Sequence, residues 1–410
     1  MKKIVLILGI IFICITVAFF IYSKKIPSTK IINEQDIHYL TDMKNLEERL
    51  KANSKLIEEI NSKYLEKINN EDNEWKNTLE EFENEESKIA EIVENLPVVG
   101  IGDSVLLGAK NALYNRFPNG YFDGKVSRTI LGGEDVISSL ESEGKLGNIL
   151  ILALANNGDY SNKRNTELME LVGERQVYWI TAAGADDPTF NEKFRDFAIN
   201  YPNLHIVEWE NITFNHPEYL YGDGVHLREG TATKAYAENI FEYIYNDYLE
   251  DFKRKKDELI AEHEEKINKR IAFYGNNVLV NVFSSIYEKL NNALYNSNPE
   301  YNFDVAYNEL KSKVESNTLE NKIVLLFDKT SNISNDEYQK IIDLCQGHEI
   351  YICDISNNNL TFENENVKVI NFYDEIKKNK DYIIADKIHL SQKGNEEFAL
   401  TLFGVIDNQE

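Results

Sequence analysis

Ser104 is a residue whose type and setting could do covalent chemistry. It lies in the segment Gly102-Asp103-Ser104-Val105, which follows a short apolar run and opens a stretch of helical character. A serine at a strand-to-helix turn lies at the carboxyl edge of a parallel sheet, where open α/β folds bind ligands, and its backbone N–H can face a developing oxyanion. The segment alone is weak evidence, because serine is also a common helix N-cap.

A carboxylate and an imidazole stand close together later in the same region. Asp223 and His226 are three residues apart in Asp223-Gly224-Val225-His226, just before a predicted helix. This spacing lets Asp223 bind Nδ1 of His226 while Nε2 faces a serine, which is the arrangement that makes a serine nucleophilic. Taken alone, His226 could be a loop histidine satisfied by Asp223. Together with Ser104, the pair predicts a site for nucleophilic catalysis by a serine.

The elements that must hold these residues are short buried strands. Four apolar runs alternate with longer stretches of helical character, namely VVGIG, NILILAL, QVYWITA and LHIVEW. Strands that are apolar on both faces and separated by crossover helices form a parallel sheet with helices on each side. We therefore predict an α/β domain over residues 97–249. The charged stretch 250–270 predicts a connecting helix.

The same order of elements appears a second time, over residues 271–410. RIAFYGNNVLV corresponds to VVGIGDSVLLG, KIVLLFD to NILILAL, EIYICDI to QVYWITA, VKVINFYD to LHIVEWEN, and DKIHLSQKG to DGVHLREG. Self-similarity of this kind indicates an internal duplication. The alternative is that two parallel α/β domains share these patterns for physical reasons alone. The paired D-x-x-H-L segments favour the duplication.

Residues 34–96 predict a helical stalk. They contain neither glycine nor proline, and apolar residues recur at helical spacing until Pro97 stops the pattern. Leu46, Leu50 and Ile57 follow a coiled-coil rhythm, which slips before Trp75. Periodicity cannot choose the partner helix, so self-association of the stalk and packing against the body of the same chain both stay open.

The apolar run 4–22 predicts a membrane segment. Its nineteen uncharged, almost wholly apolar positions are enough, at about 1.5 Å rise per residue, to cross a bilayer. A cleaved signal peptide is the competing interpretation, but the run is long and no small-residue cleavage site follows it. We therefore predict an uncleaved signal anchor within residues 1–30. Lysines flank both ends of the run, so their charge does not fix its orientation.

Composition excludes some functions. The formal net charge of −25 argues against a nucleic-acid partner, because phosphate binding requires a surplus of Lys and Arg. The three cysteines lack the spacing of zinc ligands, so no structural metal site is predicted. With 410 residues and 42% hydrophobic residues, the chain has room for two or three folded domains.

On these segments the chain resembles the SGNH hydrolase superfamily, and within it the extracellular domains of peptidoglycan O-acetyltransferases and related cell-envelope proteins. The resemblance covers residues 98–249, with a decayed echo in the second copy. The first family block is matched by Gly102-Asp103-Ser104-Val105 and the last by Asp223-Gly224-Val225-His226-Leu227. The resemblance implies a three-layer α/β/α sandwich of flavodoxin-like type, duplicated along the chain. It also implies that Ser104, His226 and Asp223 are the catalytic triad.

Two further family blocks supply groups around the oxyanion, and this chain departs from both. Ala155-Asn156-Asn157-Gly158 resembles the asparagine block, with Asn157 as the aligned residue and Ala155 in place of the usual glycine. Asp123-Gly124-Lys125-Val126-Ser127-Arg128 resembles the glycine block, with Ser127 where these acyltransferases usually have glycine. A backbone N–H survives that change. The resemblance therefore implies an oxyanion site formed by Ser127 and Asn157, beside Gly124 and Asp103.

The resemblance also implies a mechanism without metal or organic cofactor. His226 takes the proton of Ser104, the serine attacks an acyl ester, and the acyl group passes to a sugar hydroxyl or to water. Our leading hypothesis is transfer of acetyl groups to a cell-envelope polysaccharide, outside the cytoplasm. An acetylesterase that removes such groups is the closest alternative. A non-catalytic, membrane-anchored scaffold or glycan-binding protein is a third hypothesis, of a different class.

The partners and the second copy follow from the same resemblance. With one membrane segment, a transferase would receive its acyl donor from outside or from a multi-pass membrane acyltransferase. In the second copy Asn277 stands where Ser104 aligns and Thr330 stands near the Asn157 position, although Asp386 and His389 persist. We therefore expect a degenerate SGNH-like domain over 271–410 that binds glycan, docks a partner or supports the first domain.

Overall fold

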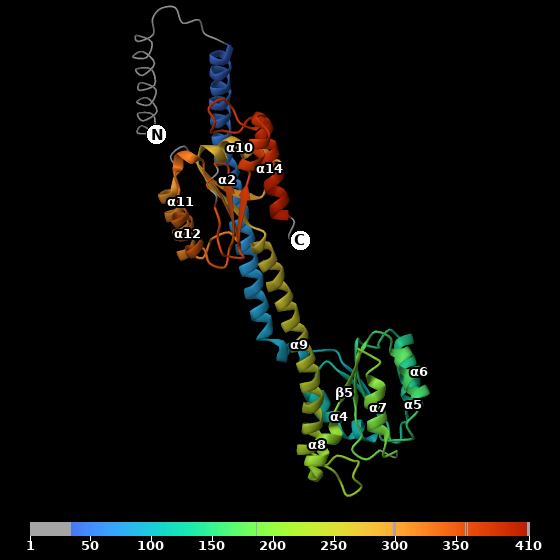
Figure 1. Cartoon of the computed structure of the whole chain (residues 1–410). Coiled ribbons are helices and arrows are strands. Elements are labelled where there is room, and N and C mark those ends of the chain that lie inside the picture. Colours follow the sequence, from blue (N-terminus) through green and yellow to red (C-terminus); the bar gives the residue numbers. More distant parts are fainter. Residues whose placement is uncertain (1–33, 186, 298–300, 357, 359, 408–410) are drawn as a thin grey trace, which may run out of the picture. The chain divides into compact units, whose positions relative to one another are not determined.

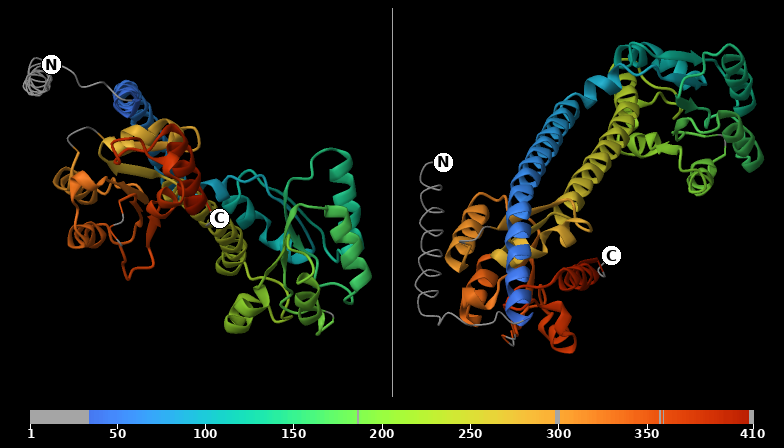
Figure 2. Two further views of the ribbon diagram at one scale, coloured as in Figure 1. Left: turned by 45° about the horizontal axis from the view of Figure 1, so that its top comes forward. Right: turned by 90° about the horizontal axis from the view of Figure 1, so that it is seen from above.

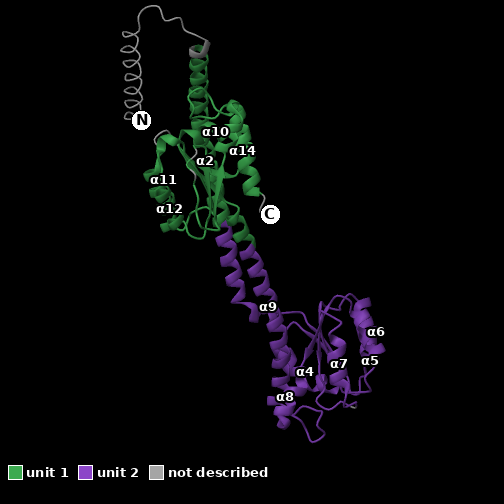
Figure 3. Cartoon of the chain, viewed as in Figure 1, with its two compact units in different colours: residues 1–73, 262–410 green, residues 74–261 purple. Residues whose placement is uncertain are grey.

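The computed structural model describes residues 34–407, except 186, 298–300, 357 and 359. The chain forms two compact units, which are unit 1 (residues 1–73 and 262–410) and unit 2 (residues 74–261), as Figure 3 shows. The predicted signal anchor, residues 1–30, lies outside the described residues. Within the described part of the chain, no helix is both long and apolar enough to cross a membrane.

Unit 2 is built on a five-stranded parallel sheet with the order β2-β1-β3-β4-β5. Its strands are β1 (Val99–Gly102), β2 (Tyr121–Gly124), β3 (Ile149–Ala153), β4 (Gln176–Ile180) and β5 (Leu204–Val207). Its helices are α3 (Ile89–Glu94), α4 (Ser104–Arg116), α5 (Ile130–Ser142), α6 (Asn162–Val172), α7 (Phe190–Ala198), α8 (Trp209–Asn215), the short η1 (Pro217–Tyr219) and the first part of α9 (Thr231–Asn268).

Helices cover both faces of this sheet (Figures 1 and 2). All five residues of β3 are buried, and they alternate between two cores. Ile151 shares a core with residues of α4 and α9, such as Ile240. Leu150 and Leu152 share the other core with residues of α5 and α7, such as Ile137 and Phe194. The predicted α/β fold with a parallel sheet is therefore confirmed for unit 2.

Unit 1 contains a second five-stranded parallel sheet, with the order β10-β9-β8-β6-β7. Its strands are β6 (Ile271–Gly275), β7 (Ala293–Ser297), β8 (Lys322–Leu326), β9 (Glu349–Asp354) and β10 (Val367–Asn371). Its later helices are α10 (Asn277–Tyr287), α11 (Phe303–Glu315), α12 (Asn335–Leu344), α13 (Tyr373–Lys378) and α14 (Gln392–Asp407), with the short η2 (Lys329–Ser331) and η3 (Lys380–Tyr382). In both sheets the first strand of the unit lies between the second and the third.

The predicted stalk is mostly one helix, α2 (Glu34–Glu86). In unit 1, Ile57 of α2 belongs to the same buried core as α10. Asn53 Nδ2 donates to the carbonyl of Val280 at 2.7 Å, and Arg49 Nε donates to Asn281 Oδ1 at 2.8 Å. The sequence left two partners open for the stalk, a second stalk or the body of the same chain. Arg49, Asn53 and Ile57 contact the body of the same chain.

The structure differs from the sequence prediction at two helix boundaries. The prediction of a single helix over 34–96 places no break at Glu86, where α2 ends and a turn leads into α3. Ile89 and Val93 of α3 are buried in the core of unit 2, which redirects the chain. The predicted connecting helix 250–270 is not a separate element, because α9 runs unbroken over Thr231–Asn268, a stretch without glycine or proline.

Candidate active site

Ser104 is held at the carboxyl end of β1, as the first residue of α4. Asp103 caps this helix, since its buried Oδ1 accepts from the N–H of Val105 at 2.8 Å. Gly102 permits the tight turn, because a Cβ at this position would lie 2.5 Å from Cβ of Leu106. The local sequence therefore fixes both the end of the strand and the start of the helix around the serine.

Asp223 and His226 lie on the loop between η1 and α9. The loop is pinned by an antiparallel bridge between Leu220 and Leu227, and Gly224 adopts a left-handed conformation with φ 72°. Asp223 Oδ1 accepts from the N–H of Val225 and of His226, each at 3.0 Å. These bonds fold the loop so that the two side chains face each other.

The side chains of Asp223, His226 and Ser104 form a continuous hydrogen-bonded chain. His226 Nδ1 lies 2.9 Å from Asp223 Oδ2, and His226 Nε2 lies 2.9 Å from Ser104 Oγ. The backbone N–H groups of Val225 and His226, with the His226 side chain, lower the pKa of Asp223 to about 2. An ionised Asp223 places the imidazole proton on Nδ1, which leaves Nε2 to accept the serine proton.

Asp103 is the centre of a second, buried network beside the serine. Its Oδ2 accepts from Asn156 Nδ2 at 2.9 Å and from Asn157 Nδ2 at 3.2 Å. Burial raises the pKa of Asp103, while these amide and backbone bonds act in the opposite direction. Asn157 Nδ2 also lies 3.3 Å from the carbonyl of Arg128, so the two amide hydrogens of Asn157 both have acceptors. Donation from Asn157 to an oxyanion would require it to release one of these long contacts.

The glycine-block segment is anchored by a buried guanidinium. Arg128 is 7% exposed, and its Nη1 donates to the carbonyls of Gly102 at 3.0 Å and Asp123 at 2.5 Å. Its Nη2 lies 3.1 Å from Asp123 Oδ1. Ser127 adopts a left-handed φ of 57°, a conformation that glycine takes without strain. Gly124 packs against α4, where a Cβ would lie 2.6 Å from the backbone nitrogen of Leu107.

The structure thus brings the predicted residues to one end of the sheet, and it adds two that the sequence did not single out. Asn156, the neighbour of Asn157, makes the shorter contact with Asp103. Arg128 joins β1 and β2 to the loop after β3 through its contacts with Gly102, Asp123 and Asn157. The only sequence signal for either residue was its place inside a family-like block. Among the described residues, no group of three or more His, Cys, Asp and Glu side chains could hold a metal ion.

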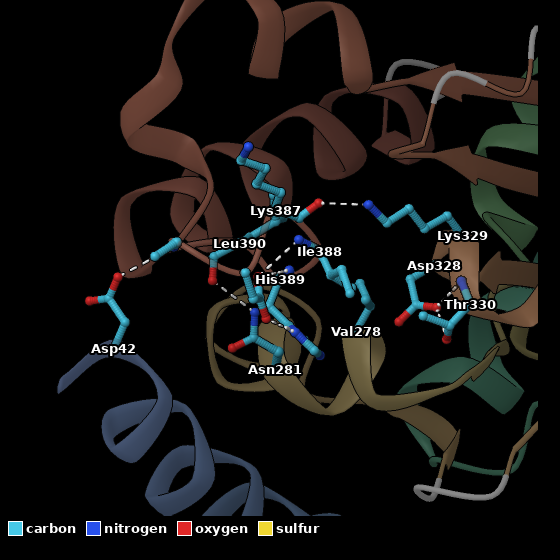
Figure 4. A network of polar contacts seen from close by, with 12 residues as sticks. Asp42, Val278, Asn281, Asp328, Lys329, Thr330, Lys387, Ile388, His389 and Leu390 are labelled. Carbon is cyan, nitrogen blue, oxygen red and sulfur yellow. Dashed lines mark hydrogen bonds and ion pairs between the residues drawn. The ribbon is translucent and has the colours of Figure 1, made fainter. Parts of the chain in front are cut away.

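Unit 1 contains a loop with the same backbone pattern (Figure 4). Asp386 Oδ1 accepts from the N–H of Ile388 at 2.9 Å and of His389 at 3.0 Å, and His389 Nδ1 lies 2.7 Å from Asp386 Oδ2. An antiparallel bridge joins Ile383 to Leu390, as in the loop of unit 2. Lys387 has φ 59° at the position that corresponds to Gly224.

The surroundings of this second pair differ from those of the first. Asn276 caps α10 as Asp103 caps α4, so Asn277 takes the position of the serine. The His389 side chain is 13% exposed, against 47% for His226. Its buried Nε2 has no hydrogen-bond partner among the residues that the structure describes. Thr330, at the predicted Asn157 position, donates to Asp328 Oδ1.

Known proteins resemble part of this chain. O-acetyltransferase OatA of Staphylococcus aureus (strain NCTC 8325 / PS 47) is 29% identical over 130 residues, which are 31% of this chain and 22% of the relative. YrhL of Bacillus subtilis (strain 168), provisionally named a peptidoglycan O-acetyltransferase, is 29% identical over 132 residues, 32% of this chain and 21% of the relative. The C-terminal catalytic domain of Streptococcus pneumoniae peptidoglycan O-acetyltransferase A aligns with a TM-score of 0.33 and 20% identity, over 39% of this chain and 96% of that domain. No protein-family model matches the chain.

The predicted resemblance to O-acetyltransferases is confirmed by these relatives. The chain spans about a fifth of the length of these curated relatives, so the likeness concerns one segment of each relative and not the whole proteins. Unit 2 carries Ser104, Asp223 and His226 in mutual contact.

Proposed function

We propose that this protein is an extracytoplasmic serine acyltransferase that passes acetyl groups to a cell-envelope glycan through an acyl-enzyme at Ser104. The observation that carries the proposal is the 2.9 Å contact between His226 Nε2 and Ser104 Oγ, with Asp223 on the other ring nitrogen. The names of the relatives support acetyl transfer and, for two of them, peptidoglycan as the acceptor.

The chemistry proceeds in two steps. His226 Nε2 takes the hydroxyl proton while Ser104 Oγ attacks the carbonyl carbon of an acetyl ester, and the imidazolium then protonates the leaving alcohol. A glycan hydroxyl, deprotonated by His226, attacks the acetyl-serine and releases Ser104. The developing oxyanion is bound by the backbone N–H of Ser104, which lies in the first turn of α4 where the helix supplies no acceptor, and by the N–H of Ser127.

An acetylesterase is the second candidate, and the exposure of the site favours it. The side chains of His226 and Asp223 are 47% and 50% exposed, so water can reach the acetyl-serine. Transferase and esterase share the first step and differ only in the acceptor of the second. The acceptor must therefore be identified in the products.

Two further parts of the proposal concern the rest of the chain. The run 4–22 anchors the protein, and a multi-pass membrane acyltransferase supplies the acetyl donor on the outer side. Unit 1 is a duplicated SGNH-like copy that has lost its nucleophile. Three features support a common origin of the two sheet domains: the matching loops, the same strand order, and the left-handed conformation of Lys387 at the position of Gly224. This conformation is unfavourable for lysine, so its presence points to an inherited loop shape.

The test uses the full chain in detergent, with a chromogenic acetyl ester as donor and an N-acetylglucosamine oligosaccharide as acceptor. Ester cleavage that is lost in Ser104→Ala and in His226→Ala supports the triad, and acetylated oligosaccharide in the products selects transfer over hydrolysis. A fluorophosphonate probe should label Ser104 alone. Full ester cleavage by Ser104→Ala would refute the assignment, and wild-type protein with neither cleavage nor labelling would favour a non-catalytic scaffold.

A further inference from the structure

A groove separate from the triad opens along the edge of the sheet in unit 2. It lies between β2, the edge strand, and α5, and it encloses about 530 Å³. Its polar lining comes from both elements and from the turn after α5, and comprises Tyr121, Asp123, Asp135, Ser139, Glu143 and Lys145. None of these side chains contacts Ser104, Asp223 or His226 in the hydrogen-bond network of the active site.

One end of the groove is tied to the active site through a buried arginine. In the sheet Asp123 pairs with Ile101 and Tyr121 with Val99, whose side chains belong to the core beneath α5, so both groove residues point to the α5 face. Asp123 Oδ1 also receives Arg128 Nη2, and Arg128 donates to the carbonyl of Gly102, two residues before Ser104. The groove therefore begins behind the oxyanion segment and follows β2 toward its first residue.

The lining has the chemistry of a sugar-binding site. Tyr121 is 47% exposed, and the negative face of an aromatic ring attracts the polarised C–H groups on one side of a sugar ring. Glu143 is held by Lys145 Nζ at 2.8 Å and by Ser139 Oγ at 3.3 Å, which fixes its carboxylate in the groove. Oriented carboxylates and a hydroxyl are groups that bind sugar hydroxyls, and Val136 and Leu140 supply the apolar part of the lining.

The charge of the lining restricts the class of ligand that the groove can bind. Asp123, Asp135 and Glu143 supply three carboxylates, while Lys145 is the single cation among the lining residues. Within the described chain the Asp135 carboxylate has no hydrogen-bond donor and no ion-pair partner, so it stays available to a ligand. Excess negative charge repels phosphate-bearing polymers and suits a neutral or amino-substituted sugar chain.

We propose that this groove binds the acceptor glycan, holding sugar residues beyond the one that is acetylated at Ser104. The inference rests on the proposed function and adds the place and the chemical class of the acceptor: a neutral or amino-substituted polysaccharide stacked on Tyr121. Binding away from the triad would place one acceptor hydroxyl at the acetyl-serine more often than water reaches it. The groove therefore favours transfer over hydrolysis in an otherwise exposed site.

The first experiment measures binding without chemistry. The full chain with Ser104→Ala is titrated with N-acetylglucosamine oligomers of increasing length, by calorimetry in detergent. Affinity should rise with oligomer length, and adding Tyr121→Ala should weaken binding of the longest oligomer about tenfold. Tyr121→Phe should keep most of the affinity because it keeps the ring, and Asp135→Asn should weaken binding several-fold. Tyr39→Ala is the matched control, since Tyr39 is similarly exposed, at 44%, on α2 outside unit 2.

The second experiment measures transfer. In the catalytically intact chain, Tyr121→Ala should lower the ratio of acetylated oligomer to free acetate about tenfold, whereas Tyr39→Ala should leave it as in the wild type. Oligomer affinity that is independent of length, or unchanged in both Tyr121→Ala and Asp135→Asn, would overturn the groove. So would tighter binding of a glycerol-phosphate oligomer than of the neutral sugar. If oligomers bind through Tyr121 but no ester is cleaved, the groove stands and the proposed catalysis fails.

Discussion

Gly224 offers a test of how the loop backbone positions Asp223 and His226, the proposed catalytic pair. It has φ 72°, and among the described residues, its two chain neighbours aside, no atom lies within 4 Å of the place where a Cβ would stand, so Gly224→Ala perturbs the backbone without a clash. A left-handed conformation costs a non-glycine residue about 1–2 kcal/mol. Replacing glycine also removes about 0.4–1 kcal/mol of unfolded-chain entropy, which offsets part of that cost. The expected net loss is about 1 kcal/mol.

The loss can be measured in unit 2 alone. The three tryptophans of the chain, at positions 75, 179 and 209, all lie in unit 2, so tryptophan fluorescence during urea unfolding reports that unit. Strain that shifts the loop also displaces Asp223 and His226 from Ser104. With about 1.4 kcal/mol for each tenfold change, we expect kcat/KM for a chromogenic ester to fall about fivefold.

Lys387 provides the opposite change at the equivalent position in unit 1. It already has φ 59°, and its backbone contacts with Ile384 and Lys329 do not use its side chain. Lys387→Gly should therefore slow hydrogen exchange in its loop, by about 0.5–1 kcal/mol of local stability. Lys380→Gly, at an exposed lysine with negative φ, should instead speed exchange. Unchanged stability in Gly224→Ala, or faster exchange in Lys387→Gly, would refute the strain argument.

Three further predictions concern the site. The Asp223 carboxyl should titrate near pH 2 by NMR, because the N–H groups of Val225 and His226 lower its pKa. Because the folded pKa is below the unfolded value, the stability that Asp223 contributes is present above the ordinary carboxyl pKa and is lost as the pH falls toward about 2. Titration of Asp223 at the ordinary carboxyl pKa would contradict this prediction. Ser127→Gly should raise the stability of unit 2 by about 0.5–1 kcal/mol and keep activity, since it removes a left-handed serine and retains the N–H; a fall in the urea midpoint would argue against it. Arg128→Gln should lower kcat/KM at least tenfold and cost about 3 kcal/mol, because Asp123 and the Gly102 carbonyl lose a buried donor. Arg175→Gln, at a surface pair with Glu141, is its control and should change stability by less than about 1 kcal/mol.

The sequence predicted those features that depend on neighbours along the chain. The turn at Ser104 follows from Gly102 and the capping Asp103, and the fold of the 223–226 loop follows from bonds that Asp223 makes within three residues. The parallel sheets follow from strands that are apolar on both faces, as in β3. Local patterns were sufficient at the two turns because their deciding contacts are local.

The features that the sequence did not predict depend on contacts far along the chain. Asn156 lies closer to Asp103 than Asn157 does because of the way the loop after β3 meets α4. The sequence could not distinguish the two residues, since they are adjacent and identical in type. The partner of α2 was open because an apolar stripe fits a second stalk as well as α10. In unit 1 Asn53 contacts the body of the same chain, through a bond to Val280 that is 227 residues away.

The two Asp-x-x-His loops share one set of contacts and differ in another. In both loops the aspartate accepts the same two backbone N–H groups and the histidine Nδ1, so this pairing folds the loop whether or not a nucleophile is present. The difference lies at Nε2, which meets Ser104 Oγ at 2.9 Å in unit 2 and has no partner within described unit 1. Folding of the loop alone therefore accounts for the contact between Asp386 and His389. The proposed catalytic assignment therefore rests on the residue that begins the helix after the first strand of each unit. This residue is Ser104 in unit 2 and Asn277 in unit 1.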